Sequence, residues 1–131
     1  MAETCLLDTH VLLWAVCQPH RLHEEIRMLV ERNQYVVSVA SLWEFINKKG
    51  RSDAPIKNPS AWWDSYVVRP KTPVLPIRPS HVLYLDDLPM LHKDPFDRIM
   101  IAQSVVEHMP LVTEDANIRK YRIDLRTASG A

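Results

Sequence analysis

Four acidic residues spread along the chain have the types and positions of a divalent-metal site. They lie just after short apolar runs or in the first turns of predicted helices: Asp8, Glu44, Asp97 and Asp115. Two unit charges 4 Å apart repel by on the order of 4 kcal/mol at an effective dielectric constant of 20. Four carboxylates in one pocket therefore need a compensating cation. Mg²⁺ is the first candidate and Mn²⁺ the second, because both ions prefer oxygen ligands.

A site of this kind suits the hydrolysis of a phosphodiester. A bound metal lowers the pKa of a water molecule, positions it for in-line attack and offsets negative charge on the phosphoryl oxygens. Acids in first helical turns also have a structural use, because they accept hydrogen bonds from free N–H groups. Glu44 and Asp97 fit either role. Asp8 precedes Thr9, a β-favouring residue, where no cap is needed to end a strand, so a functional role is favoured there.

Strand-like and helix-like apolar runs alternate along the chain, which predicts an α/β domain with a mainly parallel sheet. The predicted strands are residues 4–7, 35–39, 74–77, 111–113 and 123–125, and the predicted helices are residues 11–16, 23–32, 41–49, 59–68, 80–85, 95–108 and 115–121. Ser41 and Glu44 match the S-x-x-E pattern that begins a helix. Ligands of open α/β sheets bind beyond the carboxyl ends of the strands, where Asp8 and Asp115 fall.

Composition indicates one globular domain over residues 1–131. The chain is 47% hydrophobic, and its 16 basic residues balance 16 acidic ones, so whole-chain charge does not indicate a nucleic-acid partner. Cys5 and Cys17 match neither a metal-ligand spacing nor a disulfide framework, which predicts small buried residues and a reducing, cytoplasmic location. No apolar run approaches the roughly 20 residues of a membrane span, and the two glycines exclude a phosphate-binding glycine-rich loop.

The segments around the four acids resemble PIN-domain ribonucleases, and more narrowly the VapC-type toxins of bacterial toxin–antitoxin pairs. The resemblance rests on four blocks in the same order and spacing, at residues 6–14, 40–44, 92–103 and 111–115. The third block contains H-K-D-P-F-D-R followed by an apolar helix and is the most specific. The similarity extends from Leu6 to Ile123, which is nearly the whole chain.

This resemblance implies a three-layer α/β/α fold and a Mg²⁺-dependent endoribonuclease. The acidic quartet would be catalytic, with Asp8 and Asp97 as direct metal ligands. Glu44 and Asp115 would bind a second metal or the attacking water. Thr113 would hold the pocket by hydrogen bonding, and Asp94 would support it or cap a helix. The resemblance also implies an RNA substrate, a homodimer and a small VapB-like antitoxin whose tail fills the groove.

Several residues near the proposed pocket have more than one interpretation. Glu114 is an alternative to Asp115, although strand alternation places Asp115 on the side of Thr113. His10 and His92 are interpreted as packing or loop-bonding residues, because Mg²⁺ sites rarely use imidazole. Arg98 would pair with a carboxylate or contact a phosphate.

The tryptophans divide into two pairs. Trp62 and Trp63 lie on one short predicted helix, so one of them is expected at an interface. Trp14 and Trp43 occupy helical positions beside the quartet and are expected in the core.

Two other functions compete with the ribonuclease. The first is a catalytically silent PIN-fold module that only binds proteins, which titration with Mn²⁺ would separate from the enzyme. The second is a phosphatase that forms a phospho-aspartyl intermediate on Asp8. That chemistry uses a second aspartate two residues later, where this chain has His10. The RNA sequence cannot be derived from residues that contact only phosphate and metal.

Overall fold

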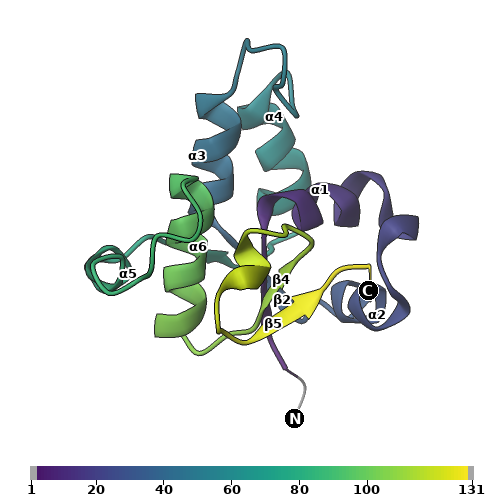
Figure 1. Cartoon of the computed structure of the whole chain (residues 1–131). Helices are drawn as coiled ribbons and strands as arrows, with labels where there is room; N and C mark the ends of the chain where they lie inside the picture. The colour runs from purple at the N-terminus through teal and green to yellow at the C-terminus, as the bar shows by residue number, and fades with distance from the viewer. Residues whose placement is uncertain (1–2, 130–131) are drawn as a thin grey trace.

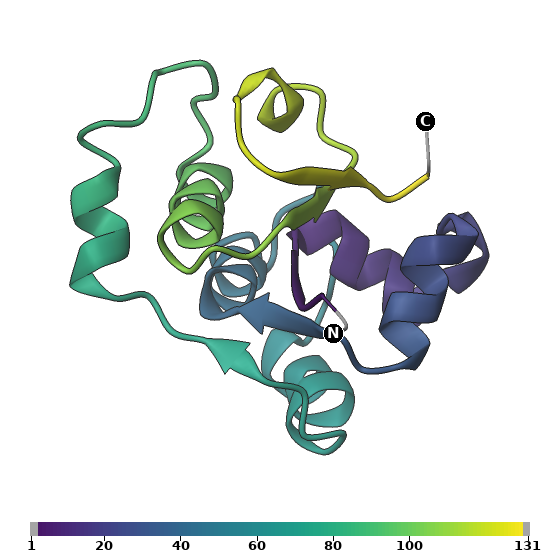
Figure 2. The same ribbon diagram turned by 90° about the horizontal axis from the view of Figure 1, so that it is seen from below.

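Five parallel strands form the centre of the computed structural model, which describes residues 3–129 (Figure 1). In spatial order they are β3 (Val74–Leu75), β2 (Tyr35–Ser38), β1 (Cys5–Leu7), β4 (Leu111–Thr113) and β5 (Leu125–Thr127). Every neighbouring pair is parallel. Helices cover both faces of the sheet (Figure 2), so the predicted three-layer α/β fold is confirmed.

Among the described residues, six α-helices connect or follow these strands. They are α1 (Thr9–Cys17), α2 (Glu24–Glu31), α3 (Val39–Asn47), α4 (Pro59–Trp63), α5 (Pro79–Tyr84) and α6 (Pro95–Val106). A π-helical segment, η2 (Asp64–Val68), continues α4, and short 3₁₀ turns are formed by η1 (Pro19–Arg21) and η3 (Ile118–Lys120). In the described part of the chain, no helix is long and apolar enough to cross a membrane.

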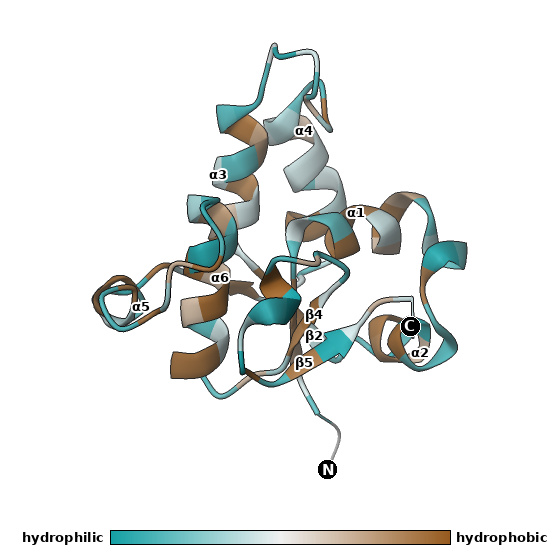
Figure 3. Ribbon diagram, in the orientation of Figure 1, coloured by the Kyte–Doolittle hydropathy of each residue, from teal (hydrophilic) through white to brown (hydrophobic). Residues whose placement is uncertain are grey.

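Side chains of the central strand alternate between two cores. Leu6 packs in the cluster that contains Ile101 of α6, whereas Cys5 and Leu7 pack with Val11 of α1. Figure 2 shows α6 on one side of the strands and α1 with α2 on the other. A strand that is buried on both faces has a continuous apolar sequence, and the centre of the molecule is accordingly brown in Figure 3.

Two predicted helix starts are wrong. Helix α1 begins at Thr9 rather than at residue 11, with Asp8 as its N-cap. Helix α3 begins at Val39, and its N-cap is Ser38, whose hydroxyl accepts from the N–H of Ala40 at 3.0 Å. The chain passes from β2 into α3 without a loop, so the cap is the last strand residue. Ser41 lies inside the helix, and the predicted capping box does not form.

The C-terminal region also differs from its prediction. Only η3 forms within residues 115–121. The side chain of Asp115 accepts from the N–H groups of Asn117 and Ile118, as a helix N-cap does, but the turn that follows ends at Lys120. The last strand, β5, begins two residues later than predicted. Its register is set by pairing with β4, in which Leu111 lies opposite Leu125.

Three predictions about burial are also corrected. Cys17 is exposed, because α1 has left the core by its last turn. Trp43 is 53% exposed on the outer face of α3, where its ring meets the edge of Phe96 at 4.8 Å between centroids. Trp63 is buried and Trp62 is half-buried against Phe45, so neither residue of this pair is the exposed tryptophan.

Candidate metal centre

The candidate site lies at the carboxyl ends of β1 and β4, the two central neighbours of the sheet. From β1 the chain crosses to β2 on one side, and β4 pairs with β1 on the other side. The strand order therefore reverses between β1 and β4, and a crevice at such a reversal is the usual ligand position in an open α/β sheet. Asp8 directly follows β1, and Asp115 lies two residues after the end of β4.

Asp8 is almost fully buried and both of its carboxylate oxygens accept hydrogen bonds. Oδ1 accepts from the N–H of Val11 at 2.8 Å, which makes Asp8 the N-cap of α1. Oδ2 accepts from the hydroxyl of Thr113, the last residue of β4. Burial raises the pKa of Asp8 to about 6 despite these two hydrogen bonds. The expectation that Asp8 has no capping role is wrong, because the helix starts immediately after it.

Asp97 lies in the first turn of α6, but Asp94 is the residue that caps this helix. Oδ1 of Asp94 accepts from the N–H groups of Phe96 at 2.8 Å and Asp97 at 3.1 Å. The Asp97 carboxylate therefore takes no part in capping α6 and is available to the candidate metal site. Burial is the largest cause that raises its pKa, to about 8, and the negative charges of Asp94, Glu44, Asp8 and Asp115 raise it further.

Glu44 lies in the second turn of α3, because that helix starts at Val39, and it is only 4% exposed. Its Oε2 pairs with Nζ of Lys48 at 2.8 Å. Oε1 is the buried side-chain oxygen without a hydrogen-bond partner among the described residues. Leaving a buried carboxylate oxygen unpaired is costly, so this atom points to a missing ligand. Lys48 was not predicted to belong to the site, although the i,i+4 spacing from Glu44 signals such a pair.

The side chains of Glu114 and Asp115 make different contacts in the structure. Glu114 turns towards the C-terminal segment, where its two oxygens accept from the N–H of Ser129 at 2.6 Å and from its hydroxyl at 2.9 Å. The backbone N–H of Asp115 donates to the Thr113 hydroxyl at 3.0 Å, which holds Asp115 beside the Asp8–Thr113 pair. Asp115 is therefore the acid that the fold brings to the quartet.

His92 contacts two acids of the quartet, which goes beyond the packing or loop-bonding role predicted for it. Its Nε2 lies 2.8 Å from Oδ2 of Asp97 and 3.6 Å from Oδ1 of Asp115. His10, in contrast, is exposed. The sequence feature that could have indicated these contacts is the position of His92 inside H-K-D-P-F-D-R, five residues before Asp97.

Arg98 contacts neither a carboxylate nor the open side of the pocket. Its buried guanidinium donates to the carbonyl oxygens of Pro89 at 3.1 Å and Leu85 at 3.4 Å, and to the hydroxyl of Tyr121 at 3.3 Å. The predicted ion pair or phosphate contact is therefore wrong. Arg98 instead holds the loop between α5 and α6 against η3, and this loop leads into His92.

The donor set fits a divalent cation with a preference for oxygen. The carboxyl groups of Asp8 and Asp97 have raised pKa values. In the described part of the chain, the buried Oε1 of Glu44 has no hydrogen-bond partner, and Lys48 forms an ion pair with Glu44. A hard divalent ion would offset the mutual repulsion of the acids and provide the missing partner. Glu44, Asp97 and Asp115 each have an oxygen that accepts no hydrogen bond from residues 3–129, and Asp8, whose two oxygens each accept one, completes the set.

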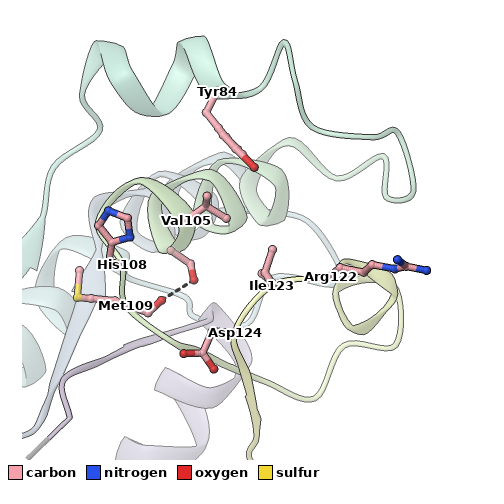
Figure 4. A pocket seen from close by; sticks show the side chains of 8 residues that line it. Tyr84, Val105, His108, Met109, Arg122, Ile123 and Asp124 are labelled. Atoms are coloured by element: carbon pink, nitrogen blue, oxygen red, sulfur yellow. Dashed lines mark hydrogen bonds between the residues drawn. The ribbon is translucent and has the colours of Figure 1, made fainter.

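Two surface hollows differ in their relation to this site. One of about 390 Å³ is lined by Leu91, His92, Lys93, Asp94 and Asn117 and opens directly beside the carboxylates. The other, of about 320 Å³, is drawn in Figure 4 and lies at the opposite end of α6, where Val105, His108 and Asp124 line it. Because Asp97 lies in the first turn of α6 and contacts His92, the first hollow is the nearer of the two to the acids.

Comparison with known proteins shows the family and the fold of the chain. The sequence model of the PIN domain matches residues 5–124, and the chain belongs to the PIN domain family. The fold is that of two solved structures, a VapBC2 complex from Rickettsia felis bound to a DNA fragment from its promoter and a DNA-bound VapBC from Salmonella typhimurium.

Both structures superpose with a TM-score of 0.67. The first is 14% identical and the comparison covers 96% of this chain and 99% of that one. The second is 17% identical, with 96% and 97% covered. No curated protein matches the chain.

Proposed function

We propose that this chain is a divalent-metal-dependent endoribonuclease that hydrolyses RNA phosphodiester bonds, with Mg²⁺ as its ion and Mn²⁺ as a substitute. The observation that carries this proposal is the convergence of four acids from separate elements on one sheet edge. Among them, the buried Oε1 of Glu44 lacks a hydrogen-bond partner within residues 3–129, and burial raises the pKa of Asp97 to about 8. A set of repelling carboxylates is costly without a cation, which favours a metal enzyme over a catalytically silent module.

The residues of the chain have distinct roles in this reaction. Asp8, Glu44 and Asp97 would hold the ion, and the bound metal would supply an activated water and offset charge on the phosphoryl group. Thr113 keeps Asp8 in place through its hydroxyl. Asp115 would orient the attacking water and accept its proton. In the absence of metal, the ammonium group of Lys48 partly neutralises the negative charge of Glu44 through their ion pair.

The hollow beside the quartet provides a path for the RNA backbone. Lys93 is exposed at its rim and makes no ion pair with the described residues, so its ammonium is available to a phosphate. Asn117 lines the same hollow and can donate a hydrogen bond from its side-chain amide. Contacts of this type position a phosphate but do not specify a base.

The biological role that we propose is the toxin of a toxin–antitoxin pair, acting in the cytoplasm as a homodimer and neutralised by a small VapB-like protein. Support comes from the PIN family and from the two similar structures, which are VapBC complexes. Exposed apolar side chains around α5 are available for subunit or antitoxin contacts: Val82, Leu83, Met90 and Leu91. We also propose that residues 1–131 form one PIN domain.

RNA cleavage by the purified chain tests the enzymatic proposal. We expect cleavage of a structured RNA with Mg²⁺, none with EDTA, and losses of at least 100-fold in Asp8→Asn and Asp97→Asn. Asp87→Asn is the matched control, because Asp87 is exposed and outside the site. Undiminished cleavage by the two site variants would refute the proposal. If calorimetry with Mn²⁺ detects no binding, the protein-binding module is favoured instead.

Co-purification tests the toxin proposal. The gene immediately upstream would encode a short protein, and co-expression should recover it bound to this chain. Expression of this chain alone should arrest growth, and co-expression should relieve the arrest. Absence of both effects would contradict the toxin role without affecting the enzymatic one.

A further inference from the structure

His92 lies between two of the four acids, in a position that resembles a metal ligand. Its Nε2 is 2.8 Å from Asp97 and 3.6 Å from Asp115, and one ligand atom from each of the three residues lies within 4.8 Å of the others. Distance alone would allow a metal ion among these atoms. The hydrogen-bond partners of the ring decide whether the nitrogen has a free lone pair.

The second ring nitrogen faces a hydrogen-bond donor. The backbone N–H of Asp94 points at Nδ1 of His92 from 3.4 Å. A backbone N–H cannot accept, so Nδ1 is the acceptor and the ring proton is assigned to Nε2. Nε2–H then donates to Oδ2 of Asp97. A metal-ligating histidine has the opposite arrangement, with its second nitrogen donating to a carboxylate or carbonyl.

The oxygens around His92 differ in how far they are already satisfied. Oδ1 of Asp115 accepts from the N–H groups of Asn117 at 2.8 Å and Ile118 at 3.1 Å. Oδ1 of Asp97 accepts no hydrogen bond from residues 3–129, and Oε1 of Glu44 is buried without a partner. Oδ2 of Asp115 also accepts no hydrogen bond from these residues, but Nε2 of His92 stands between the carboxylates of Asp97 and Asp115.

We infer that His92 is a positioning residue that donates to Asp97 and fills the space between Asp97 and Asp115, so that the pocket takes one divalent ion instead of two. That ion is held on the side of Asp8, Glu44 and Oδ1 of Asp97. This inference rests on the proposed function of the same site and adds the number of metal ions to it. The side chain of His92 is only 11% exposed, so the surrounding structure holds the ring in place.

Binding of Mn²⁺ followed by electron paramagnetic resonance tests this inference without RNA. The wild-type chain should bind one Mn²⁺ at saturation, without the nitrogen modulation of a directly bound imidazole in the pulsed spectrum. His92→Ala removes the ring and should bind the first Mn²⁺ about tenfold more weakly, because supporting partners of metal ligands contribute tenfold or more to affinity. This variant should also bind a second Mn²⁺ in the vacated space.

Two further variants control the experiment. His92→Gln keeps an N–H donor at similar reach and should retain a stoichiometry of one with affinity closer to wild type. His20→Ala removes an exposed histidine on η1 and should behave as wild type. Circular dichroism of each variant before titration establishes that the fold is retained. If His92→Ala does not fold, the wild-type stoichiometry and spectrum still decide the question.

The outcomes separate this inference from the proposed function. Two Mn²⁺ per wild-type chain, nitrogen modulation in its spectrum, or a folded His92→Ala that binds one Mn²⁺ would each overturn the inference. RNA cleavage with two ions bound would leave the ribonuclease intact and refute only the role of His92. One bound Mn²⁺ without RNA cleavage would support the inference and refute the ribonuclease. No Mn²⁺ binding to the folded chain would overturn both.

Discussion

Replacing Asp97 by asparagine should stabilise the metal-free protein while it abolishes activity. Burial and four neighbouring acids raise the pKa of Asp97 from 3.8 to about 8. Between these two values the folded state binds a proton that the unfolded state has released, so folding stability falls as the pH rises through this window. The asparagine side chain of the variant carries no charge and keeps an oxygen acceptor for His92. The folding stability of the variant therefore does not fall with pH through this residue.

The size of the effect follows from the pKa change. The unfolded carboxyl group has a pKa of 3.8. At pH 7 its ionised form therefore exceeds its protonated form by a factor of about 10³. At roughly 1.4 kcal/mol for each factor of ten, the upper limit is about 4 kcal/mol. The side chain is 17% exposed and solvent screens part of the repulsion, so we expect about 1–3 kcal/mol. For a chain of this length, that corresponds to a rise in Tm of roughly 3–12 °C.

Thermal unfolding in EDTA at several pH values measures this effect. The Tm of Asp97→Asn should exceed that of the wild type at pH 7.5, and the gap should narrow steadily as the pH falls to 5. Addition of Mg²⁺ should raise the wild-type Tm more than that of the variant. Asp87→Asn should match the wild type throughout. If Asp97→Asn is no more stable than the wild type at pH 7.5 without metal, the acids do not destabilise one another as argued.

Three other substitutions test individual contacts. Arg98→Met removes the buried guanidinium that donates to the carbonyl oxygens of Leu85, Leu88 and Pro89, and should cost about 2–4 kcal/mol in urea unfolding, whereas exposed Arg122→Met should cost almost nothing. Thr113→Val removes the hydroxyl that links the two strand ends and should lower stability by about 1–3 kcal/mol and RNA cleavage at least tenfold; cleavage at the wild-type rate would contradict this role. Lys48→Met leaves Glu44 without its cation and should lower the Tm in EDTA, with part of the loss restored by Mg²⁺; a loss that Mg²⁺ does not change would place Glu44 outside the metal site.

The strands were predictable because the side chains that they bury form short apolar runs of consecutive residues in the sequence. Cys5, Leu6 and Leu7 form an apolar run that is buried on both faces, and such a run has few alternatives to a central parallel strand. The start of α6 was equally clear, since Asp94 followed by Pro95 combines a favoured cap with a residue that fits the first helical position. The short helix predicted at 115–121 is reduced to the single turn η3, although the side chain of Asp115 accepts from two N–H groups as a helix N-cap does.

The sequence by itself determined that acids follow two apolar strands, and hence that Asp8 and Asp115 share an edge of a parallel sheet. Which acid caps a helix and which remains free was decided only by the tertiary structure. Asp8 both caps α1 and accepts from Thr113, which is 105 residues away, whereas Glu44 and Asp97 have no capping bond. Contacts between distant segments set these roles, because a carboxylate's charge and hydrogen bonds depend on neighbours that local spacing does not specify.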